Sequence, residues 1–325
     1  MKFSIIIPLY NKASYICCTV ESVLAQSFAD FEVIIVDDGS SDGGAELVAS
    51  MTDSRLSMVR QANAGVSAAR NRGIAMAKGE WVALLDADDW QHPDFLSCLI
   101  LAQQTYPEAD VVATDFVRVP DAEDSWPPKW PLLVDTPEVE LITNLPARWK
   151  IGPTICSSAV AIRNLRLQQL QPCFAPGVSR GEDLDLWFRL AEQTPIALTH
   201  APLVAYRVAV QDSLTTQHVV ELTLPWYVGR MWERAHSGAM TEAQRKSTLW
   251  YVAQCELNMA RNTIALGDRL QGVHWLIKAR RAASGKRWWV TVFMACFFPK
   301  NLIKNWDHWR VSRKAIHIDT ADAGR

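Results

Sequence analysis

The chain has 325 residues, a length that predicts two domains by the rough guide of about 100–200 residues for each. Its composition, with 49% hydrophobic and 21% charged residues, is typical of an ordinary globular protein. The formal net charge of −2 argues against a nucleic-acid partner, because non-specific binding of that kind needs a broad basic face.

Strands and helices are expected to alternate along residues 1–118. Short apolar runs predict strands, and apolar residues at helical spacing predict helices. The predicted strands cover residues 3–11, 31–38, 55–61, 80–89 and 109–119. The predicted helices cover residues 14–28, 42–51, 65–79 and 92–107. We expect Gly79 to close the third helix at its C-terminal cap. This alternation predicts an α/β fold with a doubly wound, mostly parallel sheet.

The pattern changes after residue 118. Seven prolines between residues 120 and 153 predict an irregular surface segment over about 119–150. A mixed region follows to residue 210, and the chain is helical beyond it. We therefore divide the chain into an α/β half over 1–118, a second half of the same domain over 119–210, and a helical C-terminal region over 211–325.

Two helices are predicted within the C-terminal region. Thr241 and Gln244 fit a capping box, in which each residue satisfies a backbone N–H at the start of a helix. A Gly267–Asp268 turn then separates this helix from a second one. Two helices joined by a short turn predict an αα-hairpin.

The cysteines and the N-terminus bear on the cellular compartment. The seven cysteines show no CxxC pair and no recurring spacing, which argues against a zinc site or a disulfide framework. The N-terminal apolar run stops at Pro8 and is too short for a signal peptide. An odd number of cysteines without an export signal predicts a reducing, cytoplasmic setting.

Two of the predicted strands end on carboxylates. Asp37 and Asp38 close the second strand, and Asp86, Asp88 and Asp89 close the fourth. In open α/β sheets, ligands bind at the carboxyl ends of the strands. Carboxylates brought to one edge repel each other, and a divalent cation, arginines or raised pKa values offset that repulsion. Oxygen ligands of this kind favour Mg²⁺ or Mn²⁺ bound together with substrate phosphates.

Helix capping is the simpler explanation for some of these acids. Ser40 or Ser41 would open the helix after the second strand, with acids favoured nearby. Asp89 or Asp94 would cap the helix after the fourth strand. Capping does not account for Asp86, so a metal–phosphate site is favoured. The chain has neither a G-x-G-x-x-G after its first strand nor a P-loop, which argues against dinucleotide-binding Rossmann domains and P-loop nucleotidases.

Three stretches read "SIIIPLYNKASYICCTVESVLAQSFADFEVIIVDDGSSDG", "NAGVSAARNRGIAMAKGEWVALLDADDWQHPDFL" and "GEDLDLWFRL". In combination they resemble the family 2 inverting glycosyltransferases of GT-A fold, and the resemblance spans about residues 3–207. It implies a nucleotide-diphosphate sugar donor, expected to be UDP-linked, and Mg²⁺ or Mn²⁺ as cofactor. It also implies a saccharide or lipid-linked saccharide acceptor in bacterial surface polysaccharide synthesis.

The resemblance assigns donor-binding roles to eight residues: Pro8, Leu9, Tyr10, Asp38, Arg70, Asp86, Ala87 and Arg207. The first three would cradle the nucleotide base, and Asp38 would accept an imide N–H of the uracil type. Arg70 would approach the base or the diphosphate, and Arg207 would reach the diphosphate. In the D-x-D motif of residues 86–88, Asp88 would bind the metal directly, and Asp86 would contact the ribose or the metal.

An inverting transfer also needs a base on the face opposite the departing nucleotide. The resemblance assigns this role to Asp183, in "GEDLDLWFRL", with Glu182 orienting it or binding the acceptor. Asp185 is expected to be structural. Acids are also common in a first helical turn without any catalytic role, because they interact favourably with the helix dipole.

The chain departs from the family pattern at one position. Similar enzymes often carry a histidine two residues after a Tyr-Arg pair, near the metal and the diphosphate. Here Ala209 stands in that place, and Gln211 or His218 would be the nearest polar substitute. This departure puts a histidine metal ligand in doubt, and leaves the glycosyltransferase interpretation unchanged.

Residues 286–310 are expected to contact a membrane peripherally. Five basic residues lie between 278 and 287, and an apolar stretch of 11 residues follows over 288–298. About 20 apolar residues are needed to span a bilayer. Basic flanks with Trp and Phe favour a helix lying on the anionic inner face of the cell membrane. Packing on the catalytic domain is the alternative.

Three other classes of protein fit parts of the pattern. A signalling receiver domain has paired aspartates, but it needs its phosphoacceptor on the third strand. A carbohydrate-binding module fits the fourteen tryptophans but not the acidic strand ends. A nucleotidyltransferase usually has a glycine-rich N-terminal loop, which is missing here. Glycosyl transfer is favoured, and a nucleotidyltransferase-like or non-catalytic nucleotide-sugar-binding protein is the alternative.

Overall fold

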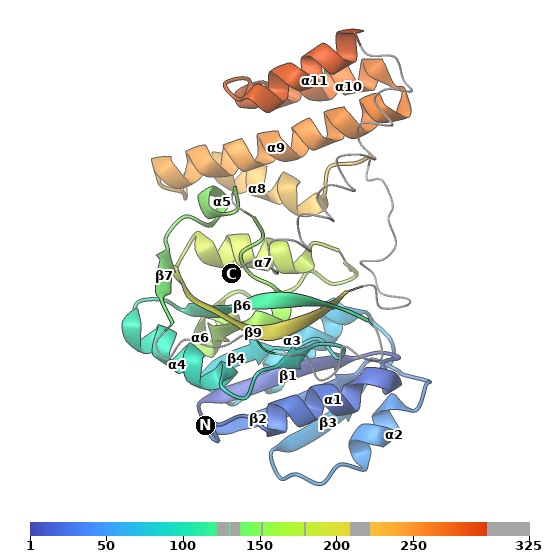
Figure 1. Cartoon of the computed structure of the whole chain (residues 1–325), viewed down its shortest axis with the longest axis vertical. Coiled ribbons are helices and arrows are strands. Elements are labelled where there is room, and N and C mark those ends of the chain that lie inside the picture. Colours follow the sequence, from blue (N-terminus) through green and yellow to red (C-terminus); the bar gives the residue numbers. More distant parts are fainter. Residues whose placement is uncertain (122–129, 131–136, 151, 179, 209–221, 298–325) are drawn as a thin grey trace. The chain divides into compact units, whose positions relative to one another are not determined.

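The computed structural model describes residues 1–121, 130, 137–150, 152–178, 180–208 and 222–297. The chain divides into two compact units, Met1–His218 and Val219–Arg325. The first unit is a sheet covered by helices, and the described residues of the second form helices and the turns between them (Figure 1). From the sequence, the change from mixed α/β structure to helices alone was predicted after residue 210.

The first unit is built around one mixed sheet. Its strands are β1 (Phe3–Leu9), β2 (Phe31–Asp37), β3 (Leu56–Arg60), β4 (Trp81–Leu84), β5 (Trp90–Gln91), β6 (Val111–Pro120), β7 (Val139–Ile142), β8 (Val160–Arg163) and β9 (Ile196–Val208). Their order is β3-β2-β1-β4-β8-β6-β9-β5, and β7 pairs with β9. Strands β1 to β4 are parallel, β8 runs antiparallel between β4 and β6, and β6 is parallel to β9. The predicted α/β fold with a mostly parallel sheet is confirmed.

Helices cover both faces of the parallel strands, which explains their continuous apolar runs. They include α1 (Ala13–Leu24), α3 (Val66–Met76) and α4 (Phe95–Thr105). On one face, Ile5 and Ile7 of β1 share a buried cluster with Ile16 of α1. On the other face, Ile6 meets Gly73 of α3, where an added Cβ would lie 2.3 Å from Ile6 Cγ2. A larger residue than glycine would therefore push α3 away from the sheet.

The predicted role of Gly79 as the cap of α3 is wrong. The helix ends at Met76, and Ala77 follows it in an extended conformation. Gly79 instead passes close to β1, where an added Cβ would lie 2.5 Å from Ser4 N. Its own N–H donates to Ser4 Oγ at 2.8 Å. Glycine is needed at this position because two backbone segments approach each other closely.

The proline-rich segment 119–150 contains more regular structure than predicted. Strand β7 lies within it and pairs antiparallel with β9. Helix α5 (Leu145–Arg148) follows, with Asn144 Oδ1 accepting a hydrogen bond from Ala147 N at 3.2 Å. The prolines keep these elements short without preventing them. Residues 122–129 and 131–136 lie outside the described residues.

Three shorter helices complete the first unit: α2 (Gly44–Ala49), α6 (Asn164–Gln169) and α7 (Glu182–Ala191). Gly43 occupies the N-cap position of α2 with a φ of 89° and makes no side-chain cap. The predicted capping of this helix by Ser40 or Ser41 is therefore wrong. The α7 helix begins after Gly181, which has a left-handed φ of 71°.

The second unit contains α8 (Trp226–His236), α9 (Glu242–Leu266), α10 (Arg269–Lys278) and α11 (Lys286–Phe297). The capping box of Thr241 and Gln244 is present at the start of α9. Gly267 ends α9 in a left-handed conformation, and Asp268 accepts from Gln271 N to begin α10. These contacts confirm the predicted helices and the turn that joins them. Within the part of the chain that the structure describes, no helix combines the length and the apolar character needed to cross a membrane.

Candidate functional site

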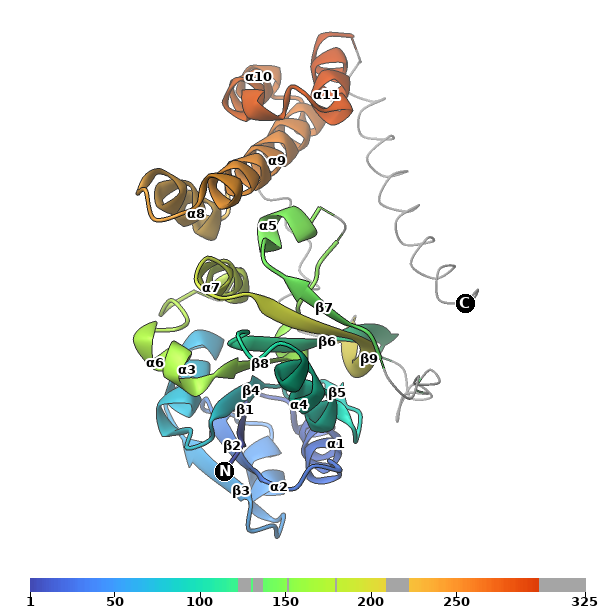
Figure 2. The same ribbon diagram turned by 90° about the vertical axis from the view of Figure 1, so that its left-hand side faces the viewer.

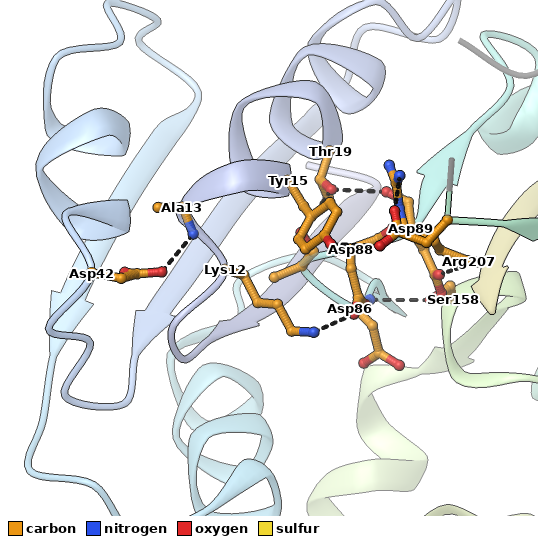
Figure 3. Close-up of polar contacts among 12 residues, drawn as sticks. Lys12, Ala13, Tyr15, Thr19, Asp42, Asp86, Asp88, Asp89, Ser158 and Arg207 are labelled. Carbon is orange, nitrogen blue, oxygen red and sulfur yellow. Dashed lines mark hydrogen bonds and ion pairs between the residues drawn. The ribbon is translucent and has the colours of Figure 1, made fainter. Parts of the chain in front are cut away.

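The turns that follow β1 and β2 are tied together by hydrogen bonds. Asn11, which has a left-handed φ of 50°, donates from its backbone to Ser40 Oγ at 3.2 Å. Asn11 Oδ1 in turn accepts from Ser41 N at 2.9 Å. Asp42 Oδ2 accepts from Ala13 N at 2.7 Å, at the first residue of α1 (Figure 3). These bonds hold the Pro-Leu-Tyr-Asn turn against the acidic turn after β2.

The three residues expected to cradle a base differ in how accessible their side chains are. Pro8 lies within β1, opposite Val36 of β2. Leu9 is fully buried, and its carbonyl oxygen accepts from Asp38 N at 2.8 Å. Tyr10 is 49% exposed, so among these three it has the most accessible side chain.

Asp38 is buried and already accepts three hydrogen bonds. Its Oδ1 accepts from Gln61 Nε2 at 2.7 Å and from Ala64 N at 2.9 Å, and its Oδ2 accepts from Gly65 N at 2.8 Å. A carboxylate has about four lone-pair sites, so one acceptor position remains on Oδ2. The bonds to residues 61–65 fix the orientation of the carboxylate at the end of β2.

The D-x-D residues lie on the turn directly after β4. Thr19 Oγ1 lies 2.9 Å from the carbonyl oxygen of Ala87 and 2.8 Å from that of Asp89, and this contact anchors the turn to α1. Lys12 extends to Asp88, with Nζ 2.6 Å from Oδ2 (Figure 3). Burial raises the pKa of the Asp88 carboxyl, and the Lys12 ammonium acts in the opposite direction. Lys12 therefore supplies the counter-charge at this carboxylate.

Asp89 has a structural position that the sequence did not predict. It is buried, and it accepts from Arg207 N at 2.9 Å and from Ser158 Oγ. Burial raises its pKa well above the usual range, and the charges of Asp88 and Asp86 add to that rise. The predicted capping of α4 by Asp89 is wrong. Asp94 is the residue at the N-cap position, and its side chain makes no cap hydrogen bond.

Arg207, near the end of β9, lies beside the D-x-D turn. Its Nε donates to the carbonyl oxygen of Asp88 at 3.0 Å, and its Nη1 lies 3.0 Å from Asp121 Oδ1. The guanidinium is 4.6 Å from the centre of the Tyr15 ring. Burial and the hydrogen bond from Tyr15 to Asp121 raise the pKa of Tyr15 to about 12. The two chain segments that contain Asp121 and Arg207 are thereby fixed beside the turn.

Arg70 joins the D-x-D turn to the start of α7. It projects from α3 and is only 4% exposed. Its Nη2 lies 2.6 Å from Asp86 Oδ1, and its Nη1 lies 2.9 Å from Glu182 Oε1. One side chain thus brings together two acidic motifs that are nearly one hundred residues apart in the sequence.

The acids of α7 have different surroundings. Asp183 is half-buried, and its Oδ1 accepts from Leu184 N at 2.7 Å. Burial raises its pKa, while the charge of Arg70 opposes that rise. Burial likewise raises the pKa of Glu182, and the charge of Arg70 opposes that rise. Asp185 is fully buried and lies 2.9 Å from Arg189 Nε, one turn along the same helix.

Helix α3 also holds the chain segment that leads into α7. Asn71 Nδ2 donates to the carbonyl oxygen of Phe174 at 2.8 Å, and Phe174 N donates back to Asn71 Oδ1 at 3.0 Å. Ser67 Oγ donates to the carbonyl oxygen of Val178 at 2.7 Å. These contacts position Glu182 and Asp183 beside Arg70. Asn71 and Ser67 were not predicted as site residues, because nothing local marks a polar helical side chain as a partner for a distant loop.

Lys12 and Ser158 were also missed. The position of Lys12, directly after the Pro-Leu-Tyr-Asn turn, was an available signal. Ser158 carries no such signal, since it arrives from the short helical turn before β8. Ala209, Gln211 and His218, considered as substitutes for a family histidine, lie outside the described residues.

Two carboxylates on the D-x-D turn fit a divalent cation that also binds substrate phosphates. Mg²⁺ is commonly held by one or two carboxylates, with phosphates and water completing its shell. Asp86 and Asp88 are both partly exposed and can supply such ligands. Among the described residues, no group of three or more His, Cys, Asp or Glu side chains is arranged to hold an ion. A cation at Asp86 and Asp88 would take its other ligands from substrate phosphates and water.

Residues 4–164 match Glycosyl transferase family 2. This segment, which is just under half of the chain, belongs to that family. The matched part contains the turns after β1, β2 and β4 together with Arg70, and it ends before α7. The start of α7 and the end of β9 thus complete the site from outside the matched segment.

Curated relatives resemble this chain over about a third of its length. Glycosyltransferase GlyG of Streptococcus pneumoniae is 33% identical over 126 residues, which are 38% of this chain and 42% of the relative. Succinoglycan biosynthesis protein ExoO of Rhizobium meliloti is 39% identical over 117 residues, 34% of each chain. Glycosyltransferase GlyA of S. pneumoniae is 32% identical over 124 residues, 38% of this chain and 18% of the relative. The chain thus spans less than half the length of these relatives.

Solved structures confirm the fold over more of the chain. Residues 1–349 of S. aureus TarS superpose with a TM-score of 0.66 at 19% identity, covering 87% of this chain and 81% of that one. The same TarS fragment in complex with UDP-GlcNAc gives a TM-score of 0.67 at 20% identity, over 87% and 83%. The chain therefore has the expected GT-A-type sheet followed by C-terminal helices.

Proposed function

We propose that the first unit is an inverting glycosyltransferase that uses a UDP-linked sugar donor. Its acceptor is a saccharide or lipid-linked saccharide in bacterial surface polysaccharide synthesis. One observation carries this proposal: Arg70 is bonded to both Asp86 and Glu182, so that the D-x-D turn and the start of α7 form one site. The UDP-GlcNAc complex of TarS and the name of ExoO, a succinoglycan biosynthesis protein, support the donor and the setting.

The donor would bind along the carboxyl ends of β1, β2 and β4. Tyr10 offers an exposed ring at this edge, and the remaining lone pair of Asp38 Oδ2 is suited to the imide N–H of uracil. Arg207 and Lys12 add positive charge beside the D-x-D turn, where the diphosphate would lie. Charge of that sign favours a diphosphate before and after the sugar bond breaks.

Asp88 and Asp86 would hold Mg²⁺ or Mn²⁺ together with the donor diphosphate. The cation would supply leaving-group stabilisation, since it neutralises charge that develops on the departing nucleotide. Lys12 Nζ lies 2.6 Å from Asp88 Oδ2, so it would have to move away for an ion to bind this carboxylate. The side chains around the D-x-D turn would then hold the donor in place.

Asp183 would act as the base. Its carboxylate would take the proton of the acceptor hydroxyl as that oxygen bonds to the anomeric carbon and the bond to the diphosphate breaks. Burial raises the pKa of Asp183, and a carboxylate with a raised pKa is a stronger base. The hydrogen bond from Leu184 N fixes the carboxylate, and Arg70 fixes the neighbouring Glu182. Glu182 is therefore a positioning residue in this scheme.

Titration calorimetry with UDP, with and without Mn²⁺, tests the donor part of the proposal. We expect Mn²⁺-dependent binding to the wild-type chain and its loss in Asp88→Ala. Asp30→Ala is the matched control, because Asp30 precedes β2 at the opposite edge of the sheet and is exposed. Absence of nucleotide binding in the wild type would overturn the proposal. Pyrophosphate release from a nucleoside triphosphate would instead indicate a nucleotidyltransferase.

A further inference from the structure

Helix α10 exposes a stripe of apolar side chains. Leu270, Val273 and Ile277 are 87%, 43% and 60% exposed. Residues spaced by three and four positions lie on the same side of a helix. Trp275 and Leu276 are buried in the core of the second unit, so α10 packs through its other side. The exposed stripe is therefore additional to the face that holds the helix in place.

Helix α11 carries a second exposed stripe. Trp289, Phe293 and Phe297 are 60%, 52% and 70% exposed, and they line an apolar hollow. Met294 and Ala295 on the same helix are buried in the shared core. The two helices lie next to each other, and Trp288 Nε1 donates to the carbonyl oxygen of Leu276 at 3.1 Å (Figure 2). Both stripes thus belong to one compact part of the molecule.

Six exposed basic residues lie on α10, on α11 or in the segment between them. Between residues 266 and 297 the chain has six basic residues and one acidic residue, whereas its formal net charge is −2. The six are Arg269, Lys278, Arg280, Arg281, Lys286 and Arg287. The single acid, Asp268, serves as the N-cap of α10. This part of the chain is therefore strongly basic, and the charges of Lys278, Arg280 and Arg281 also act on Glu256 of α9, where they oppose the rise in its pKa that burial causes.

We propose that the α10–α11 surface, formed by the two apolar stripes and the six basic residues, binds an anionic lipid bilayer. Apolar side chains enter the boundary between headgroups and acyl chains, and basic side chains contact anionic headgroups. A soluble polyanion would use the charges but not the exposed Leu270 side chain. An apolar protein partner would not need the charges. The combination of both favours a lipid surface.

This surface is larger than the contact expected at 286–310, because α10 contributes its own stripe. The inference does not depend on the donor chemistry of the first unit, so either proposal can fail without the other. If both hold, the surface would keep the protein where a lipid-linked acceptor is found. Residues 298–310 lie outside the described residues and are not needed for the proposal.

Co-sedimentation of the full-length chain with vesicles tests the proposal. One set of vesicles contains phosphatidylglycerol and phosphatidylcholine, and the other contains phosphatidylcholine alone. Ile277→Gln removes an exposed apolar group from the α10 stripe, and Phe293→Gln removes one from the α11 stripe. Leu165→Gln is the matched control, because Leu165 on α6 of the first unit is also exposed. Arg280→Gln with Arg281→Gln removes two charges, and Lys246→Gln on α9 is the charge control.

We expect binding to the anionic vesicles only. Losing two basic residues should lower the partition coefficient by about tenfold or more. Each apolar variant should weaken binding, and both controls should bind as the wild type does. UDP binding in solution should be unaffected in every variant. No vesicle binding, equal binding to neutral vesicles, or self-association that Phe293→Gln abolishes without any vesicle binding would each overturn the proposal.

Discussion

Arg70 Nη2 lies 2.6 Å from Asp86 Oδ1, and this ion pair is shielded from solvent because Arg70 is almost fully buried. The same guanidinium reaches Glu182 with its other terminal nitrogen. A planar guanidinium can donate to two carboxylates at once, whereas a lysine ammonium is a single compact charge. The geometry of the site therefore depends on the identity of this residue as well as on its charge.

Replacing Arg70 should destabilise the first unit. Arg70→Gln leaves two acidic groups without their shared counter-charge, and we expect the free energy of unfolding to fall by roughly 3 kcal/mol. Arg70→Lys should give a smaller loss, since it restores the charge but not the two-sided contact. Denaturant titration measures both. Arg72→Gln on the same helix is the control, because Arg72 makes an exposed hydrogen bond to the carbonyl oxygen of Arg60. Equal losses for Arg70→Gln and Arg72→Gln would contradict the structural role of the bridge.

Asp183 should set the acid limb of the pH profile. A base must be ionised to accept a proton, and burial raises the pKa of Asp183. The value of kcat/KM should therefore fall as pH decreases, beginning at a higher pH than an ordinary aspartate would give. Asp183→Asn should lose about 100-fold or more in kcat while it still binds UDP. Wild-type turnover in Asp183→Asn would exclude this residue as the base.

Lys12 should compete with a divalent cation for Asp88. Lys12 Nζ and a metal ion both require Asp88 Oδ2, so Lys12→Gln should raise the affinity for Mn²⁺ in the absence of nucleotide. The gain should be about fivefold, which corresponds to about 1 kcal/mol for a partly exposed ion pair. Calorimetric titration with Mn²⁺ alone measures it. Lys78→Gln, exposed in the turn before β4, should have no effect. A weaker affinity in Lys12→Gln would mean that Lys12 supports cation binding.

Gly79 should tolerate no side chain. Gly79→Ala places a Cβ 2.5 Å from Ser4 N and 2.6 Å from the Phe3 carbonyl carbon, so backbone must move to make room. We expect a loss of roughly 1–3 kcal/mol in the free energy of unfolding. Gly229→Ala, within α8, has open space around the added carbon and should not destabilise the protein. Thermal unfolding of both variants distinguishes a steric effect from a general effect of replacing glycine.

Local patterns predicted the parallel part of the sheet well. Strands β1, β2 and β4 are buried on both faces, so their apolar runs are continuous and end visibly at turns. The antiparallel insertion of β8 between β4 and β6 was not predicted, because each of its partners is distant in sequence. Strand β5 is only two residues long, which is too short to show an alternating pattern of apolar and polar residues.

In the candidate site, too, residues with a local signal were predicted and residues that act through distant contacts were not. The acids and Arg70 were identifiable because they follow recognisable strand ends or motifs, and the structure brings Arg70, Asp86 and Glu182 together. Their supporting contacts were not identifiable. Ser158 and Asn71 act through hydrogen bonds to segments that are about 70 and 100 residues away. Such contacts are decided by tertiary packing, which leaves no periodic signal in the sequence.

Strand β9 has a consequence for building chimaeras between family members. It pairs with β5, β6 and β7, yet it begins at Ile196, well beyond residue 164, where the family match ends. A cassette cut at residue 164 would expose the edge of β6, invite aggregation, and separate Arg70 from Glu182. A crossover is therefore better placed after residue 208, so that the borrowed segment brings its own closing strand.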